Sequence, residues 1–140
     1  MGDGTAHDAA PAAHPDDGPA TEVTLALDPV MVRVARVFVR EHCRALGFDS
    51  DVCATAALLI SETVTNAMTH GRSEARVRVR RGPGSLVVEV ADDSSRHPKQ
   101  PEHDVGALDG RGLSIVDALA ARWGVRDDPV GKTVWFEVRG

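Results

Sequence analysis

The segment 58–71, LLISETVTNAMTHG, constrains the fold more than any other part of the chain. In a helix, which advances about 100° per residue, Glu62 and Asn66 lie within about 40° of each other, and His70 follows on the same face. Apolar side chains gather on roughly the opposite side: Cys53, Ala56, Ile60, Val64, Ala67 and Met68. This spacing predicts an amphipathic helix that packs against a core with its apolar side and leaves its polar side available for chemistry.

The pair Glu62 and Asn66 has a chemical as well as a structural interpretation. One turn apart on a helix, a carboxylate can accept a proton from an attacking hydroxyl or water, and a carboxamide oxygen can coordinate Mg²⁺. Such an arrangement would serve phosphoryl transfer. Because glutamate and asparagine are ordinary surface residues, the alternative is a solvated helix face without chemical function.

Length and composition predict one globular domain. The chain has 140 residues, of which 42% are hydrophobic, and a formal net charge of -5. The acidic balance argues against direct binding of nucleic acid, whose phosphates favour a basic surface. Cys43 and Cys53 have neither zinc-ligand spacing nor a disulfide pattern, so we expect buried thiols. We expect no membrane span and a cytoplasmic location, because no apolar run approaches the ~20 residues of a span and no signal-peptide pattern is present.

The chain divides into a tail and a domain. Residues 1–20 are rich in Ala, Pro, Gly and Asp without apolar periodicity, which predicts a disordered tail before a domain at 21–140. Alternation of apolar and polar residues predicts strands at 21–27, 75–80, 86–90, 122–125 and 133–138. Helical spacing predicts three helices, which begin near residues 28, 49 and 110 and end near residues 46, 70 and 121.

The first predicted helix has an apolar and a basic face. We expect Asp28 to cap its start, with Pro29 as the first helical residue. Its apolar residues are Val30, Val34, Val37, Phe38, Cys43 and Leu46. Its basic residues are Arg33, Arg36, Arg40 and Arg44. The basic face is either solvated or a docking surface for an acidic protein.

Two later segments contain groups suited to a nucleotide. A carboxylate at a strand end, such as Asp92, can accept a hydrogen bond from the exocyclic amine that adenine carries where guanine has a carbonyl; the alternative is an exposed acidic turn. The polar segment 99–109 is long enough for a functional lid. Gly110 and Gly112, with Arg111 between them, open the third helix, where backbone amides can contact phosphate, although a flexible turn has the same composition.

The motif Glu62-x-x-x-Asn66-Ala67-x-x-His70-Gly71 resembles the N box of the GHKL ATPases, the superfamily of the histidine kinases and gyrase. Further motifs follow in the order typical of this superfamily, over about residue 21 to the C-terminus: Asp92, the polar loop, Gly110-Arg111-Gly112 and Gly131-Lys132-Thr133. The resemblance implies an α+β fold, a two-layer α/β sandwich of the Bergerat type. In it, helices cover one face of a mixed, mostly antiparallel sheet.

The resemblance also implies roles for individual residues. ATP would be the ligand, with Asn66 binding Mg²⁺, Asp92 contacting adenine, and Thr133 forming a hydrogen bond near Asp92. The nucleotide would also contact the helix start formed by Gly110, Arg111, Gly112 and Leu113, with the two glycines at the phosphates. Glu62 would be the general base.

Within the superfamily, the sequence is most similar to the bacterial anti-sigma serine/threonine kinases. Transfer to a serine hydroxyl benefits from a carboxylate base such as Glu62, whereas an imidazole acceptor needs no such deprotonation. This resemblance implies a homodimer that binds a sigma factor and phosphorylates a small antagonist, the anti-anti-sigma protein, on Ser or Thr. Two alternatives remain: a nucleotide-dependent protein-interaction module with little or no kinase activity, and the catalytic domain of a histidine kinase.

One segment departs from the family pattern. Where the family commonly has Asp-x-Gly-x-Gly, this chain has Asp92-Asp93-Ser94-Ser95-Arg96. Both glycines are replaced by residues that have a Cβ and therefore less freedom at positive φ. We expect this change to affect nucleotide affinity and the path of the lid, but not the role of Asp92.

Overall fold

The computed structural model describes residues 20–70, 74–93 and 108–140. In chain order, its elements are β1 (Thr21–Ala26), α2 (Met31–Ala45), α3 (Ser50–His70), β2 (Glu74–Gly82), β3 (Ser85–Asp92), α4 (Leu108–Leu119), β4 (Arg122–Asp127) and β5 (Lys132–Arg139). The tail predicted at 1–20 lies outside the described residues except for Ala20. The lid predicted at 99–109 lies outside them except for its last two residues, which belong to α4.

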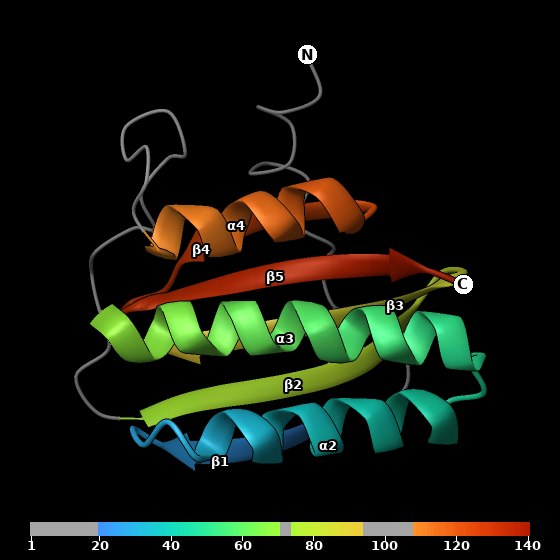
Figure 1. Cartoon of the computed structure of the whole chain (residues 1–140), viewed down its shortest axis with the longest axis horizontal. Coiled ribbons are helices and arrows are strands. Elements are labelled where there is room, and N and C mark those ends of the chain that lie inside the picture. Colours follow the sequence, from blue (N-terminus) through green and yellow to red (C-terminus); the bar gives the residue numbers. More distant parts are fainter. Residues whose placement is uncertain (1–19, 71–73, 94–107) are drawn as a thin grey trace.

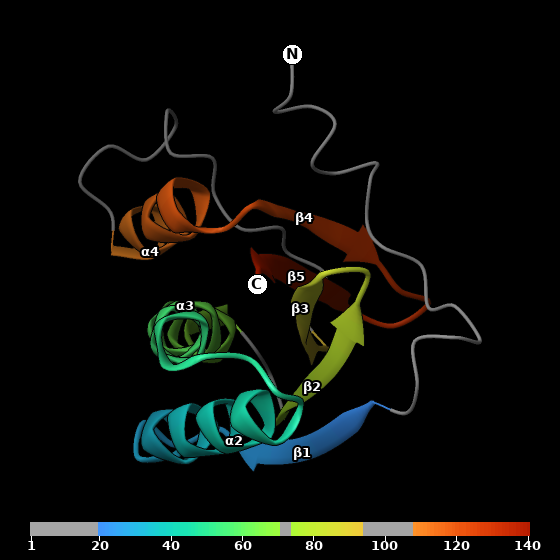
Figure 2. The same ribbon diagram turned by 90° about the vertical axis from the view of Figure 1, so that its right-hand side faces the viewer.

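The five strands form one sheet in the order β1-β2-β3-β5-β4, and each of these four described pairings is antiparallel. The three helices of the described residues lie on the same face of the sheet, with α3 between α2 and α4 (Figures 1 and 2). The predicted α+β fold, a two-layer sandwich with helices on one face, is therefore confirmed. None of the described helices is long and apolar enough to cross a membrane.

Helix α3 packs as its sequence predicts. The Asp49 side chain caps its start, because Asp49 Oδ1 accepts a hydrogen bond of 3.0 Å from the Val52 N–H. The predicted apolar stripe consists of the buried residues Cys53, Ala56, Ile60, Val64 and Ala67, together with the partly buried Met68. The buried surface of α3 is wider than this stripe, because Leu59 and Asn66, on the side of the helix that faces α4, are buried as well, while Glu62 is half-buried.

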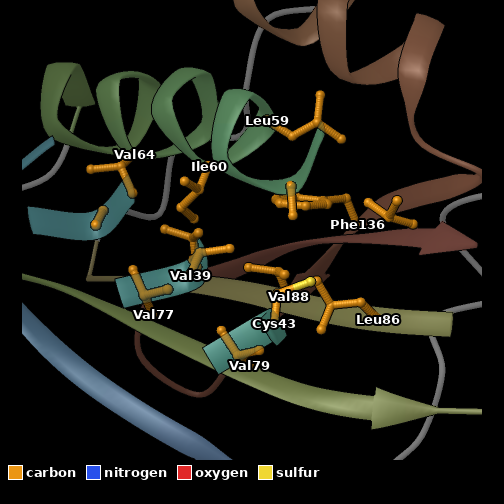
Figure 3. Packing of buried hydrophobic residues seen from close by; sticks show 14 of the residues in the cluster. Val39, Cys43, Leu59, Ile60, Val64, Val77, Val79, Leu86, Val88 and Phe136 are labelled. Carbon is orange, nitrogen blue, oxygen red and sulfur yellow. The ribbon is translucent and has the colours of Figure 1, made fainter. Parts of the chain in front are cut away.

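The core lies between the helices and the sheet (Figure 3). Its labelled side chains come from α2 (Val39, Cys43), α3 (Leu59, Ile60, Val64), β2 (Val77, Val79), β3 (Leu86, Val88) and β5 (Phe136). Burial of each such valine, leucine or phenylalanine contributes about 1.5–3 kcal/mol relative to an exposed position. This shared core fixes α3 against β3 and β5.

The prediction for α2 was wrong at its start. The helix begins at Met31, and Asp28 Oδ1 instead accepts a hydrogen bond of 3.1 Å from the Val30 N–H in the preceding turn. The buried residues of α2 are Ala35, Val39 and Cys43. Three valines that we expected on the apolar face are exposed instead: Val30 (59%), Val34 (40%) and Val37 (53%). Phe38, Cys43 and Leu46 contact the core as expected.

The two cysteines are free and buried, as expected for small apolar side chains. Burial raises the pKa of the Cys43 thiol above its ordinary value, and the neighbouring Cys53 thiol raises it further. The Cys43 thiol is therefore neutral near pH 7 and lacks the thiolate that would react with alkylating reagents.

Candidate functional site

Four chain segments with predicted site residues meet at one end of the molecule, on the left in Figure 1. They are the end of α3, the end of β3, the start of β5 and the start of α4. Helix α3 contacts the other three elements, and β3 pairs with β5. The fold therefore brings Asn66 of α3 and Asp92 of β3 to the same end of the helix–sheet interface.

Asn66 is buried, with 5% of its surface exposed. Its Oδ1 atom is inaccessible to solvent and accepts no hydrogen bond from the described residues. The adjacent buried Thr63 differs, because its hydroxyl donates a hydrogen bond of 2.7 Å to the Leu59 carbonyl. An unpaired buried oxygen costs about 1–3 kcal/mol, so the Asn66 carboxamide is not an ordinary surface group of a solvated helix.

Glu62 lies one turn before Asn66 on the same face of α3 and is half-buried. Within the described part of the chain, its carboxylate has no hydrogen bond or ion pair. The group is therefore available to accept a proton from a ligand or a partner protein.

The unpaired oxygen of Asn66 fits one ligand position of Mg²⁺, which prefers oxygen donors. No group of three or more His, Cys, Asp or Glu side chains among the described residues could hold a metal ion by itself. A single carboxamide oxygen is nevertheless compatible with Mg²⁺, because Mg²⁺ in nucleotide sites is held by one or two protein oxygens together with phosphates and water.

Asp92 is not an exposed turn residue but half of a buried ion pair. Asp92 and Lys132 are only 1% and 2% exposed, and the Lys132 ammonium lies 3.0 Å from both carboxylate oxygens of Asp92. The two residues are directly opposite each other in the ladder of β3 and β5. The carboxylate that we expected to contact adenine is therefore present in the interior, beside an ammonium group that the sequence analysis did not identify.

Gly131 makes this pairing possible. Its φ is +87°, and a Cβ at this position would lie 1.9 Å from the Asp92 carbonyl oxygen. Only glycine combines this backbone conformation with such a close approach. The start of β5 can therefore lie directly against the end of β3, which places Lys132 over Asp92.

Thr133 lies on the other face of the sheet from Lys132, because consecutive residues of a strand point to opposite sides. Its hydroxyl donates a hydrogen bond of 2.6 Å to Asp128 Oδ2, and it lines a cavity of about 410 Å³ on the face away from the helices. The hydrogen bond predicted near Asp92 is thus made by Lys132 instead of Thr133. Because β5 is buried on both of its sides, the sequence offered no signal that could have chosen Lys132 over Thr133 as the neighbour of Asp92.

The outer face of the sheet contains a second set of charges. Glu89, with 5% of its surface exposed, lies within 3.4–3.8 Å of nitrogen atoms of Arg78, Arg80 and Arg126. Two arginines of β2, Arg78 and Arg80, are therefore paired with a carboxylate of the neighbouring strand β3. Ion pairs of this kind explain the burial of Glu89 and Arg80 without a ligand.

Glu137 belongs to the same outer face. Burial opposes its ionisation, but hydrogen bonds from the Ser85 hydroxyl and the Arg122 guanidinium, with the charges of Arg122 and Arg139, lower the pKa of Glu137 below its ordinary value. The carboxylate is accordingly ionised at neutral pH, and its partners are satisfied. We assign this cluster a structural role.

The first half of α4 includes Gly110, Arg111, Gly112 and Leu113. The helix begins at Leu108, two residues before the predicted start, and ends at Leu119 rather than near Ala121. The side chains of residues 108–113 lie outside the described part of the structure, so contacts of this segment with phosphate remain a prediction. On α2, the predicted basic face lines a cavity of about 400 Å³, formed by Arg33, Arg36, Val37, Arg40, Glu41 and Arg44.

Comparison with known proteins gives a family and two similar structures. The family model of the histidine kinase-like ATPase domain matches residues 25–138. The structure of the RsbU and RsbW domains of Rv1364c from Mycobacterium tuberculosis is similar with a TM-score of 0.65 and 24% identity, covering 87% of this chain and 32% of that one. The histidine kinase domain of the blue-light activated histidine kinase EL346 from Erythrobacter litoralis is similar with a TM-score of 0.52 and 24% identity, covering 94% of this chain and 67% of that one.

At 24% identity, the two structural similarities concern the fold, and the chain spans about a third of the first of these proteins. No curated protein sequence matches the chain. The family match is independent of these structures and covers nearly all of the domain, including Glu62, Asn66, Asp92 and Lys132. The protein therefore belongs to the family of histidine kinase-like ATPase domains.

Proposed function

We propose that this protein is an ATP-binding serine/threonine protein kinase of the anti-sigma type. The observation that carries the proposal is the unpaired, buried Oδ1 of Asn66, one turn after the uncommitted carboxylate of Glu62. A metal-bound nucleotide would satisfy this oxygen, whereas the protein alone leaves it without a hydrogen bond. Membership of an ATPase family supports ATP as the ligand.

In this proposal each residue has one task. Asn66 would hold Mg²⁺, which neutralises charge on the phosphates when bound. Asp92 would accept a hydrogen bond from the adenine amine, and the start of α4, with Gly110, Arg111, Gly112 and Leu113, would contact the phosphates. We do not assign Thr133 a contact with the base, since its hydroxyl bonds to Asp128 on the opposite face.

Glu62 would act as the general base. It would accept the proton of a serine or threonine hydroxyl while that oxygen forms a bond to the γ-phosphorus of ATP. The bond between this phosphorus and the β–γ bridging oxygen breaks, and ADP leaves. The available carboxylate of Glu62 supports a hydroxyl acceptor, because transfer to an imidazole needs no base of this kind.

The partners in this proposal follow from the anti-sigma type. They are a sigma factor and a small antagonist protein that is phosphorylated, with the kinase acting as a cytoplasmic homodimer without contacting nucleic acid. The fold similarity to a protein with an RsbW domain supports this assignment at the level of architecture. The arginine-rich face of α2 is a candidate docking surface for such a partner.

The nucleotide site is tested by calorimetric titration with ATP, with and without Mg²⁺. We expect Mg²⁺ to strengthen binding to the wild-type protein, and Asn66→Ala to remove this enhancement. Thr65→Ala is the matched control, because Thr65 is the exposed neighbour of Asn66 on α3. An unchanged effect of Mg²⁺ in the Asn66 variant would contradict the metal assignment.

Kinase activity is tested separately with Glu62→Gln. We expect ATP binding to persist and phosphate transfer to a copurifying partner to fall by about 10²–10⁴-fold, the usual contribution of a general base. Asp51→Asn, exposed in the first turn of α3, is the control. If partner regulation is unchanged in Glu62→Gln, the protein is a nucleotide-dependent interaction module. An acid-labile phosphoprotein would instead indicate histidine as the acceptor.

A further inference from the structure

The ion pair between Asp92 and Lys132 has a consequence for the choice of nucleobase. The ammonium is equidistant, at 3.0 Å, from both carboxylate oxygens. It lies on the helix-covered side of the sheet, where both side chains are almost completely buried. A buried lysine at this position is not a solubilising surface group. Its ammonium instead determines the surroundings of the Asp92 carboxylate.

The backbone holds the lysine in this position. Lys132 is the first residue of β5 and is paired with Asp92, the last residue of β3. Gly131, whose φ is +87°, brings the backbone of β5 against the carbonyl of Asp92. The backbone of Lys132 is therefore held at a fixed position, from which its side chain reaches the Asp92 carboxylate.

The Lys132 ammonium adds hydrogen-bond donors beside the acceptor oxygens of the Asp92 carboxylate. Lysine has three N–H donors, and the two bonds to Asp92 use two of them. Among the described residues, no further partner of the Lys132 ammonium is found, which leaves one donor for a ligand. The site thus presents an acceptor and a donor side by side.

The two purine classes differ in what they present to such a site. A 6-aminopurine donates from its N6 amine and is accepted by a carboxylate, while the O6 of a 6-oxopurine is an acceptor that a lone carboxylate would repel. A 6-oxopurine also carries an N1–H donor beside O6. Its O6 and N1–H edge therefore matches the Lys132 ammonium and the Asp92 carboxylate, respectively.

We propose that Lys132 is a specificity-determining residue that lets the site accept 6-oxopurine nucleotides, those of inosine and guanosine, as well as ATP. The inference rests on the nucleotide site proposed above and concerns its base selectivity. Without the ammonium, O6 would face only the Asp92 carboxylate, and discrimination in favour of adenine would follow. The lysine removes that discrimination.

The experiment is calorimetric titration of the full chain with the Mg²⁺ complexes of ATP, ITP and GTP. ITP isolates the effect of O6, because it lacks the 2-amino group of GTP. We expect ITP to bind the wild-type protein within about tenfold of ATP. In Lys132→Thr, we expect the ratio of ITP to ATP affinity to fall by about 10- to 100-fold, the value of a hydrogen bond to a charged group.

The control is Arg139→Met, which removes a positive charge from the exposed end of the same strand and should leave the ratio unchanged. The ratio is internal to each protein, so partial destabilisation of a variant cancels. If Lys132→Thr does not fold, the wild-type ratio decides. ATP binding with ITP more than 100-fold weaker in the wild type, or an unchanged ratio in Lys132→Thr, overturns this inference alone. If none of the three nucleotides binds, both this inference and the proposed function are overturned.

Discussion

Gly131→Ala tests whether the close approach of β5 to Asp92 organises this end of the molecule. A Cβ at Gly131 would lie 1.9 Å from the Asp92 carbonyl oxygen and 2.6 Å from the Asp93 Cα, so the two backbones must separate by about 1 Å to admit it. The backbone conformation of Gly131, with φ +87°, adds strain of about 1–2 kcal/mol for any residue with a Cβ.

Gly84→Ala is the matched control. Gly84 also has positive φ, +67°, but a Cβ there meets no atom within 4 Å. Alanine at residue 84 should therefore cost only the conformational strain of about 1–2 kcal/mol. At residue 131 the separation of strands should also weaken the buried ion pair of Asp92 and Lys132, whose disruption costs about 3–5 kcal/mol when one charge is left unpaired.

We expect Gly131→Ala to lower the free energy of unfolding by about 3–5 kcal/mol and Gly84→Ala by about 1–2 kcal/mol. The measurement is urea denaturation followed by tryptophan fluorescence, with comparison of midpoints at equal m-value. Trp135 lies in β5, four residues after Gly131, and Trp123 in β4 beside it, so the probes report on this region. Equal losses in the two variants would refute the close approach as the reason for glycine at residue 131.

Three further outcomes are expected. Lys132→Met should lower the free energy of unfolding by about 3–5 kcal/mol. Most of this loss should be recovered in the double variant with Asp92→Leu, because an apolar pair can replace a buried ion pair. A double variant as unstable as the single one contradicts this. Glu137→Gln should destabilise the protein near pH 7. The difference in free energy of unfolding between variant and wild type should shrink as the pH falls below the ordinary pKa of 4.5, because the folded-state pKa of Glu137 is lowered. The same difference at every pH in a denaturation series would exclude this linkage. Cys43 and Cys53 should react with a thiol reagent only at the rate of unfolding, and rapid labelling in native buffer would show that they are accessible.

The sequence predicted α3 correctly because its pattern allows only one buried face. Cys53, Ile60 and Val64 recur at helical spacing, and the opposite face has Glu62 and Asn66. The stripe therefore determines how the helix packs on the sheet.

Helix α2 was predicted less well because apolar residues occur on both of its sides. Val30, Val34 and Val37 form one candidate stripe, while Ala35 and Val39 belong to another. The structure buries the second, which contains small side chains in close contact with α3, and exposes the first beside the arginines. Hydrophobicity alone cannot choose between two such stripes, since the choice depends on the shape of the neighbouring helix.

The position of Asp92 was predictable, but its partner was not. Strand β5 is buried on both sides from Lys132 to Val138, so polarity does not indicate which residues face the helices. Only the pairing of Asp92 with Lys132 resolves the ambiguity, and that register depends on Gly131. Thr133 was consequently assigned to the face that Lys132 occupies.

The buried charges on the two faces of the sheet differ in a way that bears on function. On the outer face, Glu89 has three arginine neighbours and Glu137 has a hydroxyl and a guanidinium, so these clusters are accounted for within the protein. On the helix side, Asp92 and Lys132 form a buried ion pair of a kind that is often no more stabilising than an apolar replacement of similar volume. A contribution to stability therefore does not by itself explain the pair, which agrees with our proposal that a nucleobase contacts this donor and acceptor. The oxygen of Asn66 at the end of α3 supports the same proposal, because it is buried and has no hydrogen-bond partner among the described residues.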